Sequence, residues 1–103
     1  MQQRTIIECL RRDQQRLREL GVESISLFGS AAREQMSEES DVDLAVKLSA
    51  RFSQGGFDYF ARMEALRGEL SNLLGREVDV VEEPARQASM QSAIDRDRVV
   101  AFP

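Results

Sequence analysis

The sequence predicts a domain of the α/β or α+β class, built around a small mixed β-sheet. Apolar residues recur at helical spacing over residues 5–20 and 57–74, and they alternate with polar residues over 22–28 and 42–48. Helical and extended segments that alternate along a chain are typical of a fold in which helices cover a sheet. The 103 residues suffice for one hydrophobic core and not for a second, so residues 1–103 are expected to form a single domain.

The amino-acid composition of the chain limits the classes of function that it can have. The chain is 42% hydrophobic and 31% charged, as is usual for a globular protein in water. Its net charge of -4 gives no basic footprint for direct nucleic-acid binding. No apolar run approaches the roughly 18 residues of a membrane span, and no signal-peptide segment follows the N-terminus. The single cysteine, Cys9, cannot form an internal disulfide, so we expect a cytoplasmic protein with no membrane partner.

The first part of the chain predicts a helix, a strand and a second, short helix. Isoleucines and leucines three to four positions apart predict an amphipathic helix over residues 5–20, which ends at Gly21. Alternation over residues 22–28 predicts a strand. A short helix is expected over residues 31–36, with Ser30 as its N-cap residue.

The middle of the chain holds the clearest strand pattern. Apolar residues alternate without interruption over residues 42–48, which predicts a strand with one apolar face. Residues 49–56 predict a loop, either a plain connector or a segment that orders over a bound nucleotide. Residues 57–74 predict a second amphipathic helix. Its apolar residues are expected in the core: Phe60, Met63, Leu66, Leu70 and Leu73.

The last third is less regular. Residues 77–81 predict a short strand that carries Asp79 between valines. Residues 85–98 have a weak helical pattern. Residues 99–102 are interpreted either as an edge strand or as a packed tail. Because no histidine is present, catalysis by a histidine-activated nucleophile and zinc sites with histidine ligands are excluded.

A turn rich in small residues follows the first predicted strand. Gly29 and Ser30 stand where an extended segment gives way to a helical one, and backbone N–H groups at such a turn attract anions. Gly29 permits close backbone approach, and Ser30 offers an N–H and a hydroxyl to a phosphate. Arg33, one turn further on, has two open interpretations: it reaches the phosphates, or it pairs with a nearby acid.

Three aspartates are candidate metal ligands. Asp41 and Asp43 are two residues apart in an extended segment, so their carboxylates project from the same face. Asp41 alone could be a turn residue, Asp43 alone a charge that discourages edge pairing, and Asp79 alone half of a salt bridge. Aspartate is rare in strands, and like charges on one face repel unless a cation lies between them. Together with the preceding turn, they favour divalent metal binding by Asp41, Asp43 and Asp79.

The ordered set Gly29-Ser30-x-x-Arg33, Ser40-Asp41-x-Asp43-Leu44 and Val78-Asp79-Val80 resembles the nucleotidyltransferase superfamily of DNA polymerase beta type. The short length of the chain is similar to that of the minimal branch of this superfamily, the MNT-domain antitoxins. This resemblance implies the nucleotidyltransferase core, a small mixed sheet with helices packed mainly on one side. It also implies that the three aspartates are catalytic and hold Mg²⁺, with two ions expected, and that Gly29, Ser30 and Arg33 bind ATP. The family commonly has glycine after the arginine, where this chain has Glu34.

The same resemblance implies a biological role. Its members transfer AMP from ATP to a tyrosine of a HEPN-domain RNase toxin, so we expect an antitoxin that forms an oligomer with such a toxin. Asp79 is the position that would activate the acceptor hydroxyl. Two alternatives stay open at this point. The chain could be a non-catalytic antitoxin that neutralises its toxin by binding alone, or a nucleotidyltransferase that acts on a small molecule or an RNA end.

Overall fold

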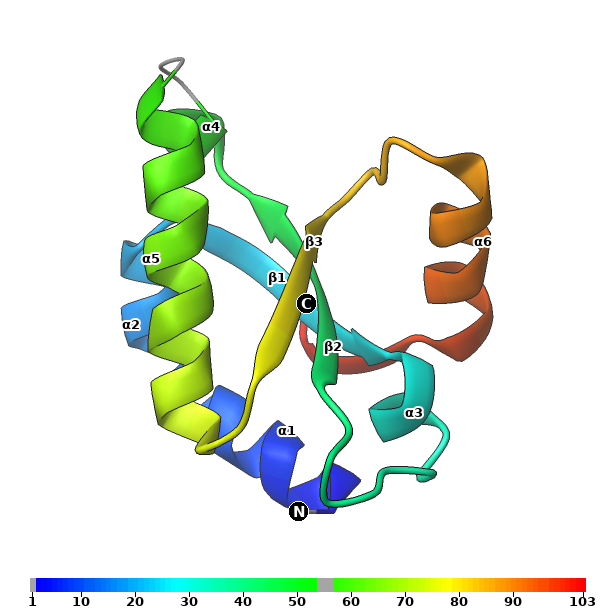
Figure 1. The fold of residues 1–103 in the computed structure, drawn as a ribbon. Helices are drawn as coiled ribbons and strands as arrows, with labels where there is room; N and C mark the ends of the chain where they lie inside the picture. Colours follow the sequence, from blue (N-terminus) through cyan, green and yellow to red (C-terminus); the bar gives the residue numbers. More distant parts are fainter. Residues whose placement is uncertain (1, 54–56) are drawn as a thin grey trace.

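The fold is a four-stranded mixed sheet covered by helices (Figure 1). The structure is a computed structural model, and it describes residues 2–53 and 57–103. The strands lie in the order β3-β2-β1-β4. Strand β1 pairs antiparallel with both β2 and β4, whereas β2 and β3 run parallel. The strand bounds are β1 Val22–Phe28, β2 Val42–Leu48, β3 Val78–Glu82 and β4 Val99–Phe102.

Helices lie on both sides of this sheet. Their bounds are α1 Gln3–Arg12, α2 Gln14–Glu19, α3 Gly29–Ala32, α4 Ala50–Ser53, α5 Phe57–Leu74 and α6 Ala88–Asp97. Figure 1 shows α2 and α5 on one side of the sheet and α6 on the other. The parallel strands β2 and β3 are joined by the crossover that contains α4 and α5. Within the described ranges, no helix is long and apolar enough to cross a membrane.

Two apolar clusters of unequal size form the core. The larger one joins α1, α2 and α5 to the sheet, and its fully buried members include Ile6, Leu10, Leu17, Leu27 and Leu70. The smaller one lies under α6 and contains Phe28, Ala45 and Ile94. The predicted fold class is confirmed: the sheet is mixed, and most of the helical packing is on one side.

The regular patterns predicted their elements well. The strands over 22–28 and 42–48 and the helix over 57–74 have the bounds that alternation and helical spacing predicted. The strand around Asp79 begins and ends one residue later than predicted. Residues 99–102 form an edge strand on β1, so the first of the two interpretations of this segment is confirmed.

Two helical predictions near the N-terminus need correction. The helix predicted over residues 5–20 is broken at Asp13, whose ψ of 10° separates α1 from α2, because aspartate is a weak helix former. Ser30 is not an N-cap residue. It lies inside α3, with Phe28 in the capping position, because the chain turns directly out of β1 at Gly29. Helix α3 ends early because Glu34 adopts a left-handed φ of 58°.

Two further predictions failed around α5. Residues 50–53 of the predicted loop are helical, since Phe52 packs in the core with only 6% of its surface exposed. Residues 54–56 lie outside the described residues. Phe60 was expected in the core but is 68% exposed. The buried stripe of α5 continues from Leu66 through Met63 to Tyr59, and Phe60 lies one position beside it.

Candidate active site

Asp43 and Asp79 are neighbours on adjacent strands. They are register partners in the parallel pairing of β2 with β3, where neighbouring strands lie about 4.8 Å apart. Partners in register project from the same face of a sheet, so both carboxylates lie on the face that carries Ala45 and α6. The structure therefore brings together two of the three aspartates that the sequence singled out, from positions on either side of the crossover.

The Gly29-Ser30 turn lies against this carboxylate pair. Phe28 at the end of β1 is the register partner of Asp43, so the turn that follows it begins beside Asp43. Gly29 has a φ of 69°, and a Cβ added there would collide with Oδ2 of Asp43. Both the backbone conformation and the space require glycine at this position. The predicted phosphate-binding turn and the predicted metal ligands thus belong to one site.

Charge repulsion is evident at Asp43. Burial raises the pKa of the Asp43 carboxyl above its usual value, and the charges of Asp79 and Asp41 raise it further. The positive charge of Arg33 acts in the opposite direction. Asp41, the exposed residue that precedes β2, is therefore within electrostatic range of Asp43. The charged form of Asp43 is therefore disfavoured unless a cation compensates it.

The carboxylate oxygens of this site suit a hard divalent cation. Among the residues that the structure describes, no three histidine, cysteine or acidic side chains form a ready-made metal cluster. The available donors at Asp43 and Asp79 are carboxylate oxygens, which Mg²⁺ prefers, and Mg²⁺ commonly takes one or two carboxylates and completes its shell with substrate phosphates and water. Burial is the main cause of the raised pKa of Asp43, and a bound cation would offset both this cost and the repulsion from Asp79 and Asp41.

Arg33 is paired with an acid. Its Nη1 lies 2.6 Å from Oδ2 of Asp97, whose side chain is 6% exposed, and its Nε donates to the side chain of Gln35 at 3.1 Å. Of the two interpretations of Arg33, the ion pair is the one present in this structure. It joins the end of α3 to the end of α6, and Arg33 still acts on the charge of Asp43. Contact of Arg33 with a triphosphate stays a prediction.

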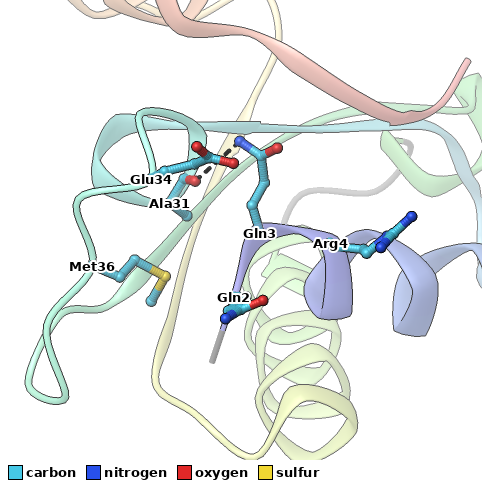
Figure 2. A pocket seen from close by; sticks show the side chains of 6 residues that line it. All are labelled: Gln2, Gln3, Arg4, Ala31, Glu34 and Met36. Carbon is cyan, nitrogen blue, oxygen red and sulfur yellow. Dashed lines mark hydrogen bonds between the residues drawn. The ribbon is translucent and has the colours of Figure 1, made fainter.

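Gln3 holds the C-terminal end of α3, the same end at which Arg33 lies, and no sequence pattern pointed to this contact. The Gln3 side-chain amide donates to the carbonyl oxygens of Ala31 at 3.4 Å and Ala32 at 2.8 Å. Figure 2 shows this side chain reaching from the start of α1 toward Ala31 in a pocket of about 410 Å³ that Glu34 and Met36 also line. Because these carbonyls are the last in α3, Gln3 helps to orient the short helix that begins with the Gly29-Ser30 turn.

Sequence reasoning also did not identify Arg76, which positions the segment that leads to Asp41. Its Nη2 donates to the carbonyl oxygens of Ser37, Glu38 and Ser40, at 2.8, 3.1 and 2.6 Å. These carbonyls belong to the turn that immediately precedes Asp41. Such a contact joins residues at least 36 positions apart, and no spacing rule points to it.

Comparison with known proteins agrees with this geometry. The family described as "Polymerase beta, Nucleotidyltransferase" matches residues 5–101. The curated protein named "Putative protein adenylyltransferase MJ1379", from Methanocaldococcus jannaschii, is 36% identical over 77 residues, which are 74% of this chain and 73% of that protein.

Solved structures with the same fold include "Structure of putative minimal nucleotidyltransferase". It has a TM-score of 0.73 and 26% identity, and the match covers 96% of this chain and 95% of that one. A second structure is described as "tri-AMPylated Shewanella oneidensis HEPN toxin in complex with MNT antitoxin". Its TM-score is 0.62 at 22% identity, over 97% of this chain and 71% of that one. With its Gly-Ser turn beside paired aspartates, the chain belongs to the nucleotidyltransferase family of DNA polymerase beta type.

Proposed function

We propose that this protein is the antitoxin of a toxin–antitoxin pair and acts as a Mg²⁺-dependent protein adenylyltransferase. It transfers AMP from ATP to a tyrosine of a HEPN-domain RNase toxin in the cytoplasm. The observation that carries the proposal is the register pairing of Asp43 with Asp79 beside Gly29. The name of the Methanocaldococcus jannaschii relative supports adenylyl transfer, and the description of the Shewanella oneidensis complex motivates the choice of partner.

The residues of the turn would bind the nucleotide. Gly29 lets the backbone approach the phosphates closely, and Ser30 offers its N–H and hydroxyl. Arg33, which follows the last residue of α3, would contribute positive charge from one helical turn away. Asp41, Asp43 and Asp79 would hold two Mg²⁺ ions, which when bound supply positive charge at the phosphate oxygens and align the acceptor with the leaving group. Nucleotidyl transfer needs that charge and that alignment above all.

Asp79 would receive the proton of the acceptor. It is exposed on the edge strand β3, whereas Asp43 is half-buried on the inner strand β2. The tyrosine oxygen forms a bond to the α-phosphorus while the bond from that phosphorus to the bridging oxygen breaks. Pyrophosphate leaves, and Asp79 takes up the hydroxyl proton. An acceptor can reach Asp79 from solvent, because β3 has no further described strand beside it.

The test compares wild-type protein with the double variant Asp41→Asn with Asp43→Asn, each co-expressed with the HEPN-domain partner. Mass spectrometry of the partner is expected to show added adenylate with wild type and none with the variant, and neutralisation of the toxin is expected to be lost. Asp58→Asn, an exposed aspartate in the first turn of α5, is the matched control. Neutralisation without any adenylate on the partner would contradict the proposal and support an antitoxin that acts by binding alone.

The same measurement distinguishes other acceptors. If wild-type protein consumes ATP and releases pyrophosphate while the partner stays unmodified, the acceptor is a small molecule or an RNA end. A circular dichroism spectrum of the double variant checks its fold, because substitution of exposed or half-buried aspartates by the near-isosteric asparagine is expected to leave the core intact.

A further inference from the structure

A groove of about 710 Å³ crosses the free edge of β3. Its apolar lining includes Phe60 and Met63 of α5, Val80 and Val81 of β3, and Met90 of α6. Successive side chains of a strand point to opposite faces, so a groove lined by both valines lies across the strand edge. Phe60 is 68% exposed and Met90 38% exposed, which makes this an accessible apolar surface.

The backbone at this edge is available for pairing. The Val42 N–H donates to the Glu77 carbonyl at 3.0 Å, and the Glu83 N–H donates to the Val46 carbonyl at 2.8 Å. In a parallel ladder with this register, the odd-numbered residues of β3 bond to β2. The N–H and C=O groups of Val78 and Val80 therefore point away from the sheet, and within residues 2–53 and 57–103 no partner for them is found.

At the opposite edge of the sheet, arginine side chains bind backbone carbonyl groups. Arg11 donates from Nε to the Ala101 carbonyl of β4 at 2.7 Å, and Arg18 donates to the Pro103 carbonyl at 2.6 Å. Side chains that occupy edge carbonyls discourage the addition of another strand. The β3 edge instead combines outward-pointing backbone groups with flanking apolar side chains, which is the surface that an extended peptide recognises.

We propose that the β3 edge and its groove bind an extended segment of the acceptor protein as a fifth strand, and that this strand presents the acceptor hydroxyl beside Asp79. The proposal rests on the proposed function and names the docking surface for its protein substrate. A residue opposite Asp79 on the added strand projects from the same face as Asp79 and Asp43. Its hydroxyl oxygen can then bond to the α-phosphorus as pyrophosphate leaves, with its proton passing to Asp79.

The chemistry of the groove favours a polypeptide. Phenylalanine, methionine and valine side chains form much of its lining, and the whole chain carries a net charge of -4. A nucleic acid would require a basic surface for its phosphates. An extended peptide gains backbone hydrogen bonds from the strand edge and places alternate side chains in the apolar groove.

The first test removes apolar side chains from the groove and measures adenylyl transfer to the HEPN-domain partner. Phe60→Ala with Met90→Ala is expected to raise the KM for the partner about tenfold, as for the loss of a central interface contact. The dissociation constant for ATP is expected to stay unchanged. The matched control is Leu20→Ala with Val100→Ala, which removes two apolar side chains of 42% and 41% exposure outside the groove. Equal KM values for the two double variants would overturn the docking proposal while the proposed function stood.

The second test observes the backbone directly. Hydrogen exchange of the Val80 amide is measured with and without the partner, in the Asp41→Asn with Asp43→Asn variant, so that no turnover occurs. Exchange is expected to slow at least about tenfold on binding, because the outward N–H becomes hydrogen-bonded. Unchanged exchange in a formed complex would overturn the proposal. Protection of Val80 in a dimer of the chain alone would also overturn it, with a second copy as the occupant.

The experiments distinguish failure of the docking proposal from failure of the proposed reaction. If the partner protects the Val80 amide and Phe60→Ala with Met90→Ala weakens its binding, but wild-type protein adds no adenylate, the docking surface stands and the proposed reaction falls.

Discussion

The backbone of Gly29 lies directly against the carboxylate of Asp43, with no room for a Cβ between them. This relationship joins the turn after β1 to the face of β2. The conformation of the turn at Gly29 and the position of the Asp43 side chain therefore constrain each other. The contact also makes the site sensitive to any larger side chain at Gly29.

Gly29→Ala is expected to lower the free energy of unfolding by about 1 to 3 kcal/mol, because alanine at a φ of 69° is strained. It is also expected to weaken Mg²⁺-dependent ATP binding, since the new methyl group displaces Asp43. Urea denaturation and calorimetric titration check the two effects. Gly68→Ala is the control, since no atom lies within 4 Å of a Cβ there. It is expected to stabilise α5 by roughly 0.5 to 1 kcal/mol. A Gly29→Ala protein as stable as wild type would contradict the close contact.

Glu34 occupies a backbone conformation that suits glycine. Its φ of 58° lies in the left-handed region, which side chains with a Cβ rarely adopt. Glu34→Gly is expected to raise the free energy of unfolding by up to about 1 kcal/mol through relief of that strain. Gln35→Gly, at the next exposed position and without a positive φ, is expected to destabilise instead. Thermal unfolding of the two variants would show opposite shifts, and a common direction would contradict the prediction.

Arg76→Met is expected to free the turn before Asp41 and cost about 1 to 3 kcal/mol of stability, as for charged hydrogen bonds that are lost. ATP binding in the presence of Mg²⁺ should weaken as well, because the turn that positions Asp41 is no longer held by Arg76. Arg12→Met, an exposed arginine at the end of α1, is the control for loss of charge and is expected to change neither quantity. Wild-type affinity in the Arg76 variant would show that the turn needs no such support.

Stability is expected to fall in acid through Glu83, which lies at the end of β3. Its carboxylate accepts hydrogen bonds from Arg98 at 2.7 and 2.5 Å and from Gln91 at 2.8 Å. The Arg98 hydrogen bond lowers the pKa of Glu83 below its usual value, and that of Gln91 lowers it further. A carboxyl whose folded-state pKa is depressed stabilises the protein above its unfolded-state pKa, and this contribution disappears as the pH falls through the folded-state value.

Glu83→Gln is therefore expected to cost roughly 2 kcal/mol at neutral pH and progressively less in acid. Urea midpoints measured at several pH values provide the test. Glu77→Gln, with a side chain that is 77% exposed, is expected to have little effect at any pH. A penalty for Glu83→Gln that is independent of pH would contradict the role of its charge.

The sequence predicted the elements better than the contacts between them. Alternation over 42–48 fixed which residues of β2 face the main core, because burial of one face enforces period two. The proximity of Asp79 to Asp43 followed from the family resemblance, and the structure shows the pairing that produces it. The contacts of Gln3 with α3 and of Arg76 with the turn before Asp41 are long-range polar interactions, which leave no periodic signal. Phe60 was misplaced because the buried stripe of α5 passes beside it.

The crossover between β2 and β3 has a consequence for the order of events during synthesis. Asp43 and Asp79 meet only after the intervening helix has packed across the sheet, since parallel neighbours cannot be joined by a tight turn. A nascent chain that has emerged only as far as α5 therefore contains the Gly29-Ser30 turn and Asp43 but lacks Asp79. The pairing of the two carboxylates should therefore arise late in translation, when the final third of the polypeptide leaves the ribosome.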